Sequence, residues 1–294
     1  MPIKVLQTLD VDQQRTAIDG WQQHYAQMSS GRFHGSIVHA QCNGVEAYEE
    51  RMNTRVEQHF HAPDNALVFS FDMADGALYL LNSQSQNTWI TPENYREVAV
   101  VVDLNLMGQA PCADSLDGLL LTPLKSQQSQ VFSSWLSYVL NTLSATPGAS
   151  LDANLSRQLV DDCLFVLDSS SRSLDQPRQR RLAEDRRIVS QVFELASAYP
   201  EDNFNVLQLA TAAGVTVRQL QHSFTHFTGI TPSAWLRLRR LNAAHRDLAR
   251  AAPEETTVAE VAMRWSFWHL GRFSEAYRGL FNEQPKCTLQ RRGA

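Results

Sequence analysis

The C-terminal third of this 294-residue chain contains one pattern twice: a short apolar-periodic helix, a tight turn, and a second helix with a polar outer face. The first copy covers residues 207–224 and the second covers residues 258–277. Each copy has apolar residues on only one side of its helices, so this region is expected to fold as a bundle of short helices. A helix–turn–helix unit places one helix in a major groove of DNA, and two units can read successive grooves about one turn apart. The repeat therefore predicts sequence-specific DNA binding.

Capping residues set the limits of the two units. Asn205 is a suitable N-cap for a first unit over residues 206–227, and Thr257 is one for a second unit over residues 257–279. Residues 233–251 between them carry one apolar stripe and predict a long connecting helix. The C-terminal region is thus expected to be all α, with two helix–turn–helix units joined by a long helix.

The second helix of each unit carries polar side chains that match base edges. Arg and Gln fit the donors and acceptors of guanine and adenine in the major groove, and Glu can accept from a cytosine amino group. The expected DNA-binding residues are Thr216, Arg218, Gln219, Gln221, His222, His269, Gly271, Arg272 and Glu275. A solvated helix face carries the same residue types, but the repetition in both units favours a reading surface. An alternative, in which these helices contact only proteins, is disfavoured by the arginines on their outer faces.

The formal net charge of −5 conceals an asymmetry along the chain. Residues 188–294 carry 12 Lys and Arg against 9 Asp and Glu, whereas residues 1–187 carry 14 against 22. Phosphate neutralisation needs local positive charge, so a mildly basic C-terminal part fits double-stranded DNA as the partner. A difference of this size also arises by chance and is a weak signal by itself.

The N-terminal part changes from helical to strand-like patterning. A helix is expected over residues 10–28, followed by short alternating segments separated by turn signals. Strands are expected over residues 35–41, 46–52, 66–72, 78–81, 88–90 and 98–103. Strands of this length and spacing predict a small β-barrel or sandwich over residues 32–103.

Two further helices and a linker complete the predicted organisation. Residues 130–143 and 151–167 carry apolar stripes, which either cover the open side of the barrel or form a dimer surface. Residues 169–181 are rich in Ser, Arg and Gln and predict a linker. The chain is therefore expected to be α+β, with a sensing and dimerisation domain over residues 1–168 and a DNA-binding domain over residues 182–294.

Composition indicates an ordinary globular protein of the cytoplasm. No apolar run approaches the length of a membrane span or a signal peptide, so no membrane association is expected. The four cysteines are scattered, which favours reduced thiols over disulfides or a zinc site. A redox-sensing role for Cys42 or Cys112 is a possible alternative, although an isolated thiol in a β-rich segment is more often a small core residue.

The C-terminal motifs resemble the DNA-binding domain of the AraC/XylS family of bacterial transcription regulators. The matching stretches are residues 209–215, 220–232, 240–244, 258–262 and 273–281. Residues 269–278, followed by Pro285 and Leu289, are similar to the XylS and ethanolamine-regulator branch. By this resemblance, positions 218, 221, 222, 272 and 275 would meet bases. The chain departs from the family at Ser266 and Asn282, where glycine is usual.

The N-terminal part resembles the cupin-like sensing domains of that family more loosely, chiefly around residues 21–35. The resemblance implies a small-molecule effector bound inside the barrel, a homodimer formed by nearby helices, and recruitment of RNA polymerase. The candidate effector-binding residues are Tyr48, Phe69, Tyr79 and Trp89, because such pockets are mostly apolar with a few polar groups. The same residues would equally well form plain barrel core.

Enzyme function is not expected, and no cofactor or metal is implied. The chain contains neither a Gly-x-Ser-x-Gly motif nor a Gly-rich phosphate loop. A remote alternative is a cupin-type metal-binding protein that uses His59 and His61, since alternate residues of a strand point to one side. The favoured function is a DNA-binding transcription activator controlled by an effector. A ligand-independent or repressing regulator is the nearest alternative.

Overall fold

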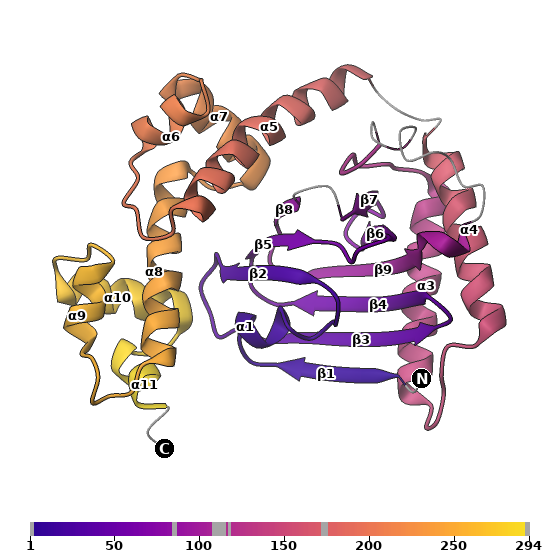
Figure 1. Ribbon diagram of the computed structural model, residues 1–294, viewed down its shortest axis with the longest axis horizontal. Helices are drawn as coiled ribbons and strands as arrows, with labels where there is room; N and C mark the ends of the chain where they lie inside the picture. Colours follow the sequence, from indigo (N-terminus) through magenta and orange to yellow (C-terminus); the bar gives the residue numbers. More distant parts are fainter. Residues whose placement is uncertain (1–2, 84–86, 108–115, 117–118, 172–175, 292–294) are drawn as a thin grey trace. The chain divides into compact units, whose positions relative to one another are not determined.

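The computed structural model describes residues 3–83, 87–107, 116, 119–171 and 176–291 (Figure 1). Contacts between Cα atoms divide the chain into two compact units. The first unit comprises residues 1–25 and 33–176, and the second comprises residues 26–32 and 177–294. The division between residues 176 and 177 falls inside the segment expected as a linker. That segment is helical at both of its described ends, because α4 extends to Ser171 and α5 begins at Gln176.

The first unit contains two β-sheets. The larger sheet has six antiparallel strands in the order β1-β3-β4-β9-β6-β7, and the smaller has the order β2-β5-β8. The strands are β1 (Lys4–Thr8), β2 (Gln22–Gln27), β3 (Gly35–Cys42), β4 (Val45–Met52), β5 (Val56–His61), β6 (Ala66–Asp72), β7 (Leu78–Asn82), β8 (Asn87–Ile90) and β9 (Tyr95–Asp103). The described strands do not close into a barrel. The expected closed barrel is therefore wrong, and two sheets stand in its place.

Helices cover one face of the larger sheet. The helical elements of this unit are α1 (Val11–Gln14), η1 (Leu104–Leu106), α3 (Gln127–Ala145) and α4 (Ala153–Ser171). Phe132 and Leu136 of α3 and Leu159 of α4 belong to the same buried apolar cluster as Phe71 and Val98 of the sheet. Side chains alternate along a strand. The residues between those packed on α3 and α4 therefore face away from these two helices.

Six of the nine described strands coincide with the predicted ones to within a few residues, and the helix expected over residues 10–28 is wrong. Only α1 is helical there. Gly20 has a φ of 83°, and this left-handed conformation prevents one continuous helix from reaching the residues of β2. The i, i+4 spacing of Trp21 and Tyr25 therefore falls on a loop and a strand rather than on one helical face. Strands β1, β2 and β5 were not predicted as separate strands.

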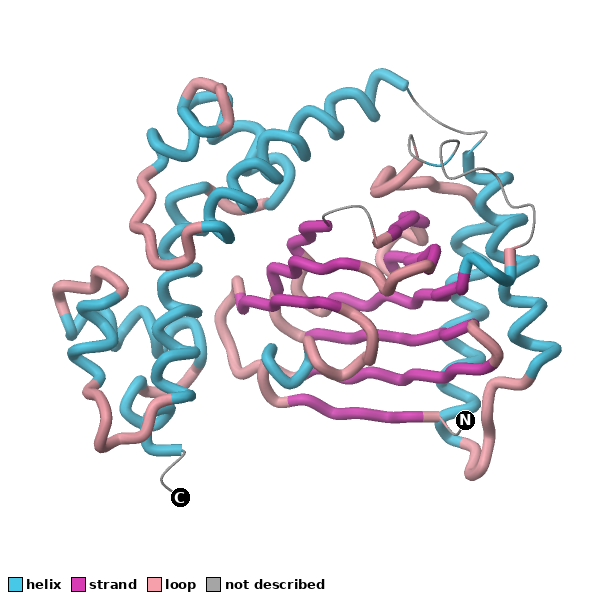
Figure 2. Tube along the Cα trace, viewed as in Figure 1, coloured by secondary structure: helices cyan, strands magenta, loops and turns pink. Residues whose placement is uncertain are grey.

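The second unit is helical over residues 177–291, with connecting loops (Figure 2). Its helices are α5 (Gln176–Ala198), α6 (Val206–Ala212), α7 (Val217–Thr228), α8 (Pro232–Arg250), α9 (Val258–Arg264), α10 (Leu270–Phe281) and α11 (Pro285–Gln290). Asn205, Thr216 and Thr257 cap α6, α7 and α9 through their side chains, as the sequence predicts. Gly229, with a φ of 73°, ends α7. The predicted limits of the two helix–turn–helix units and of the connecting helix agree with the structure to within two residues, whereas α5 begins at Gln176, inside the segment expected as a linker.

Helix α8 is continuous over 19 residues and packs against both helix–turn–helix units. At its start, Trp235 contacts Phe193 of α5 and Phe224 of α7, with ring centroids 5.1 and 5.5 Å away. Towards its end, Leu241 and Leu248 enter a buried cluster with residues of α9, α10 and α11. At a rise of 1.5 Å per residue, α8 is about 28 Å long, close to the length of one DNA turn.

Polar contacts reinforce the second half of this unit. Asp247 of α8 accepts hydrogen bonds from Trp265 Nε1 at 2.9 Å and from Arg264 at 3.0 Å. The buried hydroxyl of Tyr277 lies 2.6 Å from Nδ1 of His245 and 2.7 Å from the hydroxyl of Thr288. These bonds connect α9, α10 and α11 to α8, and those of Tyr277 and Thr288 satisfy hydroxyl groups that would otherwise be buried without a partner.

Two turns of the second unit hold a non-glycine residue in the left-handed conformation. Ser266, in the turn between α9 and α10, has a φ of 61°, and Asn282, which ends α10, has a φ of 54°. These are the two positions at which the chain departs from the glycine usual in the AraC/XylS pattern. Asn tolerates this conformation better than other non-glycine residues, whereas Ser does not share that advantage.

We predict that Ser266→Gly raises the free energy of unfolding of the second unit by about 0.5–1 kcal/mol. Relief of a left-handed strain of about 1–2 kcal/mol exceeds the added chain entropy of glycine, which is about 0.4–1 kcal/mol. Urea denaturation followed by circular dichroism measures the change. The matched control is Ser274→Gly inside α10, which is expected to lower the same quantity by roughly 0.5 kcal/mol. A loss of stability for Ser266→Gly would contradict the strain argument.

Candidate functional site

The second helices of both units present their polar faces to solvent. All nine residues expected to bind DNA are exposed, namely Thr216, Arg218, Gln219, Gln221, His222, His269, Gly271, Arg272 and Glu275. The opposite faces are buried through Leu220 and Phe224 in α7 and through Phe273 and Tyr277 in α10. Whether the exposed faces contact bases stays a prediction, but the geometry needed for it is present.

The exposed side chains of α7 project from a helix that is capped at its start and buried on its inner face. Thr216 accepts a hydrogen bond from the backbone N–H of Gln219, which satisfies one donor of the first turn. No hydrogen bond or ion pair to another described residue engages the side chains of Arg218 and Gln221. His222 stacks on His226 with ring centroids 6.1 Å apart, and Nδ1 of His226 lies 2.7 Å from Asp185. Arg218 and Gln221 therefore retain their hydrogen-bonding groups for an external partner.

Helix α10 is built in the same way but begins differently. His269 occupies its N-cap position without a side-chain hydrogen bond to the helix. Arg272 and Glu275 are exposed and, within the described part of the chain, form no ion pair. A Cβ added at Gly271 would meet no heavy atom within 4 Å, so the surface around this residue is open. The start of α10 is thus unobstructed by its own unit.

Comparisons with known proteins agree with this architecture. Residues 209–291 match a family model described as a helix-turn-helix domain. The chain is 38% identical over 103 residues to a "Probable thc operon regulatory protein" of Rhodococcus erythropolis, covering 35% of this chain and 31% of that protein. It is 36% identical over 101 residues to "XylDLEGF operon transcriptional activator 2" of Pseudomonas putida, covering 33% of this chain and 64% of that protein.

A solved structure also matches this region. It is titled as that of a probable AraC family transcriptional regulator from Rhodopseudomonas palustris, and it is 34% identical to the chain. The alignment covers 95% of that chain and 35% of this one, with a TM-score of 0.33 over the whole length. Residues 209–291 are therefore a helix-turn-helix domain similar to those of AraC family transcriptional regulators. The matched segment spans about a third of the first curated relative and less than two thirds of the second, so it concerns the helical unit alone.

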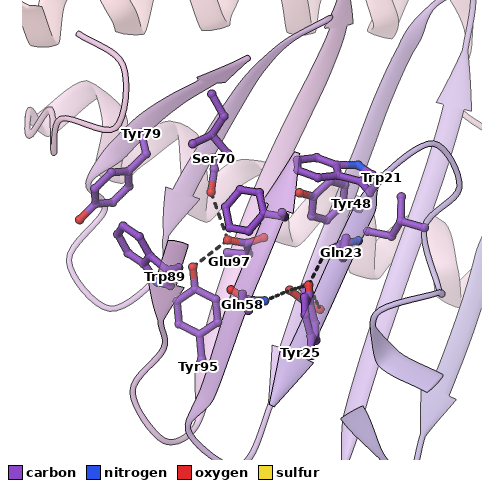
Figure 3. A pocket seen from close by; sticks show the side chains of 14 residues that line it. Trp21, Gln23, Tyr25, Tyr48, Gln58, Ser70, Tyr79, Trp89, Tyr95 and Glu97 are labelled. Carbon is purple, nitrogen blue, oxygen red and sulfur yellow. Dashed lines mark hydrogen bonds between the residues drawn. The ribbon is translucent and has the colours of Figure 1, made fainter. Parts of the chain in front are cut away.

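The first unit contains a pocket between its two sheets (Figure 3). The empty space measures about 500 Å³, including the part open to solvent. The larger sheet contributes Tyr48, Glu50, Ser70, Tyr79, Tyr95 and Glu97. The smaller sheet contributes Tyr25, Gln58, Phe60 and Trp89, and Trp21 lies just before β2. The pocket thus lies on the face of the larger sheet that α3 and α4 leave uncovered.

Three of the four residues expected to bind an effector line this pocket. Tyr48, Tyr79 and Trp89 belong to its walls, and the rings of Tyr79 and Trp89 meet edge to face with centroids 4.6 Å apart. Phe69 does not line the pocket, because it is fully buried in the apolar cluster against α3 and α4. Its neighbour Ser70 points to the pocket instead, as strand alternation requires.

The sequence reasoning missed the two carboxyl groups of the pocket. Burial raises the pKa of Glu50 to about 8, with a further contribution from the neighbouring Glu97. Burial also raises the pKa of Glu97, against the opposing effect of hydrogen bonds from Tyr95 and Ser70. Each carboxyl lies in a β-strand of alternating pattern, but their proximity depends on the pairing of β4 with β9. No local signal in the sequence shows that pairing.

The histidines and cysteines singled out from the sequence have ordinary surroundings. His59 Nδ1 lies 3.1 Å from the Thr88 hydroxyl, and its Nε2 contacts Glu57 at 2.5 Å. The described residues contain no group of three or more side chains placed to hold a metal ion. Cys42 is partly buried and free of disulfides, whereas Cys112 lies outside the described residues. Among the described helices, none is both long and apolar enough to cross a bilayer.

The raised pKa of Glu50 predicts a loss of stability with increasing pH. A carboxyl whose folded-state pKa lies above its unfolded value stabilises the fold fully below about pH 4.5 and loses that contribution as pH rises to about 8. The expected slope reaches about 1.4 kcal/mol per pH unit within that window. Urea denaturation at a series of pH values measures it. The Glu50→Gln variant is expected to show a flatter profile, and an unchanged profile would contradict the assignment.

Proposed function

We propose that the chain regulates transcription by inserting α7 and α10 into successive major grooves of double-stranded DNA. The observation that carries the proposal is the exposure of Arg218, Gln221, Arg272 and Glu275 on helices fixed to the continuous α8. The match of residues 209–291 to a helix-turn-helix family model supports it, and the DNA-binding domain of AdpA, a similar protein, has been solved with a target DNA. That domain is 26% identical over 33% of this chain and 86% of that chain, with a TM-score of 0.30.

We further propose that a small molecule in the pocket of the first unit controls this activity. The pocket joins polar groups to aromatic walls, which is the composition expected of a ligand site. A ligand would act by favouring one of two conformers of the protein, which requires a differential affinity of a few kcal/mol at most. Activation with recruitment of RNA polymerase is the favoured output, because a relative is named as a transcriptional activator. Repression, or regulation without a ligand, is the alternative.

The proposal includes a homodimer formed through α3 and α4. These helices line an open groove whose apolar residues include Val131, Trp135 and Phe165. Val131 and Phe165 are 62% and 61% exposed, which is a large exposure for two apolar side chains that line the same groove. A second copy of this surface would cover them by a two-fold contact.

We predict that Arg218→Ala and Arg272→Ala each weaken binding to a selected DNA site about tenfold to a hundredfold. Each arginine is expected to contribute about 1–3 kcal/mol of base discrimination. The site is first obtained by selection from a random DNA library with the full chain, and affinity is then measured by fluorescence anisotropy. Arg157→Ala, an exposed arginine of α4, is the matched control and should bind normally. If both reading-helix variants bind like the control, the assigned reading faces are wrong.

The dimer surface predicts a second result. Val131→Glu combined with Phe165→Glu is expected to shift the protein from dimer to monomer in sedimentation velocity, because two buried carboxylates would face each other across the contact. Leu104→Glu replaces a 42% exposed leucine outside the groove and should leave the oligomeric state unchanged. A wild-type protein that is already monomeric at micromolar concentration would remove this part of the proposal.

A further inference from the structure

The floor of the pocket contains two acidic side chains placed directly opposite each other. Glu50 of β4 and Glu97 of β9 are register partners in the antiparallel ladder, so their side chains leave the sheet on the same face. Glu50 is 2% exposed, and both residues line the pocket. Like charges directly opposite each other destabilise a sheet, and burial adds a desolvation cost. Two ionised carboxylates in these positions therefore destabilise the folded protein unless a positive charge neutralises them.

The described residues around this pair supply hydrogen bonds, but none that lines the pocket supplies a positive charge. Glu50 accepts from Gln14 Nε2 at 2.8 Å and from Gln58 Nε2 at 3.2 Å. Glu97 accepts from the Tyr95 hydroxyl at 2.7 Å and from the Ser70 hydroxyl at 3.1 Å (Figure 3). Among the described residues that line the pocket, none is Lys, Arg or His. The polar donors therefore hold the carboxyl groups in place without neutralising them.

Glu49, the residue before Glu50, shows how this sheet neutralises a buried carboxylate. Glu49 points to the opposite face and accepts hydrogen bonds from Arg51 at 2.7 Å and from Arg96 at 2.8 Å. Burial alone would raise the pKa of Glu49, but these two arginines outweigh it and hold the pKa below its ordinary value. Two adjacent glutamates thus have opposite surroundings, one with two cations and the other with a second carboxyl group.

Aromatic rings surround the acidic pair. Trp21 meets Tyr48 edge to face with centroids 6.2 Å apart, and it lies 5.7 Å from Phe60. Tyr79 and Trp89 form a second contacting pair. The faces of such rings carry partial negative charge and attract cations within about 6 Å. Carboxyl groups and ring faces therefore favour the same sign of charge in a ligand.

Two donors of the pocket walls have no acceptor within the part of the chain that the structure describes. The indole Nε1 atoms of Trp21 and Trp89 are buried, and neither finds a hydrogen-bond partner among the described residues. A buried N–H without an acceptor costs about 1–3 kcal/mol, so such groups normally meet a partner in the functional state. Their presence in the walls of this pocket is a sign, independent of the carboxyl pair, that the pocket has an occupant.

We propose that this pocket binds a small organic cation, of the ammonium or guanidinium class, whose charged nitrogen lies between Glu50 and Glu97 and whose apolar part contacts the aromatic walls. Because a cationic nitrogen only donates hydrogen bonds, the natural ligand also carries an acceptor, such as a carbonyl or hydroxyl oxygen, for the indole N–H groups of Trp21 and Trp89. This inference deepens the proposed effector site and rests on that part of the proposed function. A bound cation favours the ionised form of both carboxyl groups. Binding is therefore accompanied by release of the proton that the empty pair holds near neutral pH. The tyrosines that face the pair, Tyr25, Tyr48 and Tyr95, stay neutral because burial raises the pKa of each.

The test compares ligands that differ in charge but share one ring. Benzylammonium, benzyl alcohol and benzoate are titrated into the full-length protein by isothermal calorimetry, and phenylguanidinium serves as a second cation. We expect at least one cation to bind with a dissociation constant below about 1 mM, and about tenfold or more tighter than the alcohol or benzoate. The measured heat should differ between buffers of unequal ionisation enthalpy, which reports proton release on binding.

Glu97→Gln and Glu50→Gln keep the shape of each side chain and remove its charge. Each is expected to weaken the binding of the cation about tenfold or more. Glu46→Gln is the matched control, because Glu46 lies on the same strand and face as Glu50 but outside the pocket. Near-UV circular dichroism confirms that every variant is folded.

Three results would overturn the inference. They are binding of benzyl alcohol or benzoate as tight as that of the cations, cation binding that survives in both pocket variants, and absence of binding by both cations at about 10 mM. DNA binding is measured on the same preparation with the selected site. A protein that binds DNA but no cation refutes only the inference, whereas one that binds the cation but no DNA refutes the proposed function.

Discussion

The burial of both ends of α8 is the interaction on which the rest of the C-terminal unit depends. Trp235 at one end is 1% exposed and packs on Phe193 and Phe224, and Leu248 near the other end is fully buried. Each helix–turn–helix unit is too small to bury its apolar face alone. Because both helix–turn–helix units pack on this one continuous helix, the separation of α7 from α10 follows from the length of α8.

The first unit depends on a different constraint, the alternation of side chains across its six-stranded sheet. One face carries Phe71 and Val98 against α3 and α4, and the other carries Tyr48, Ser70 and Glu97 towards the pocket. A register shift of one residue would exchange these two sets. The pairing of β4 with β9 therefore decides at once where the apolar core lies and which carboxyl groups face each other.

Local sequence signals were sufficient to predict most helices of the second unit, but they were insufficient to predict how the strands of the first unit pair. Caps such as Thr216 and Thr257 act within one helical turn, so each helix begins where its own sequence places it. The end of α10 is also set locally, because Asn282 tolerates the left-handed conformation that ends the helix. The expected helix over residues 10–28 failed because Gly20 and the pairing of β2 in a sheet override a weak i, i+4 spacing. The acidic pair was missed because 46 residues separate Glu50 from Glu97, and only the sheet register brings them together.

The two compact units thus differ in their chemistry. The second exposes arginines to solvent, and the first encloses carboxyl groups among aromatic rings. We propose that α7 and α10 read two successive grooves of one DNA site. Chemical interference, in which bases of the selected site are methylated in the major groove before binding, tests this claim most directly. If both helices enter the major groove, two clusters of interfering bases are expected on one face of the duplex, about 10 base pairs apart. A single cluster, or binding that major-groove methylation leaves unchanged, would contradict this reading.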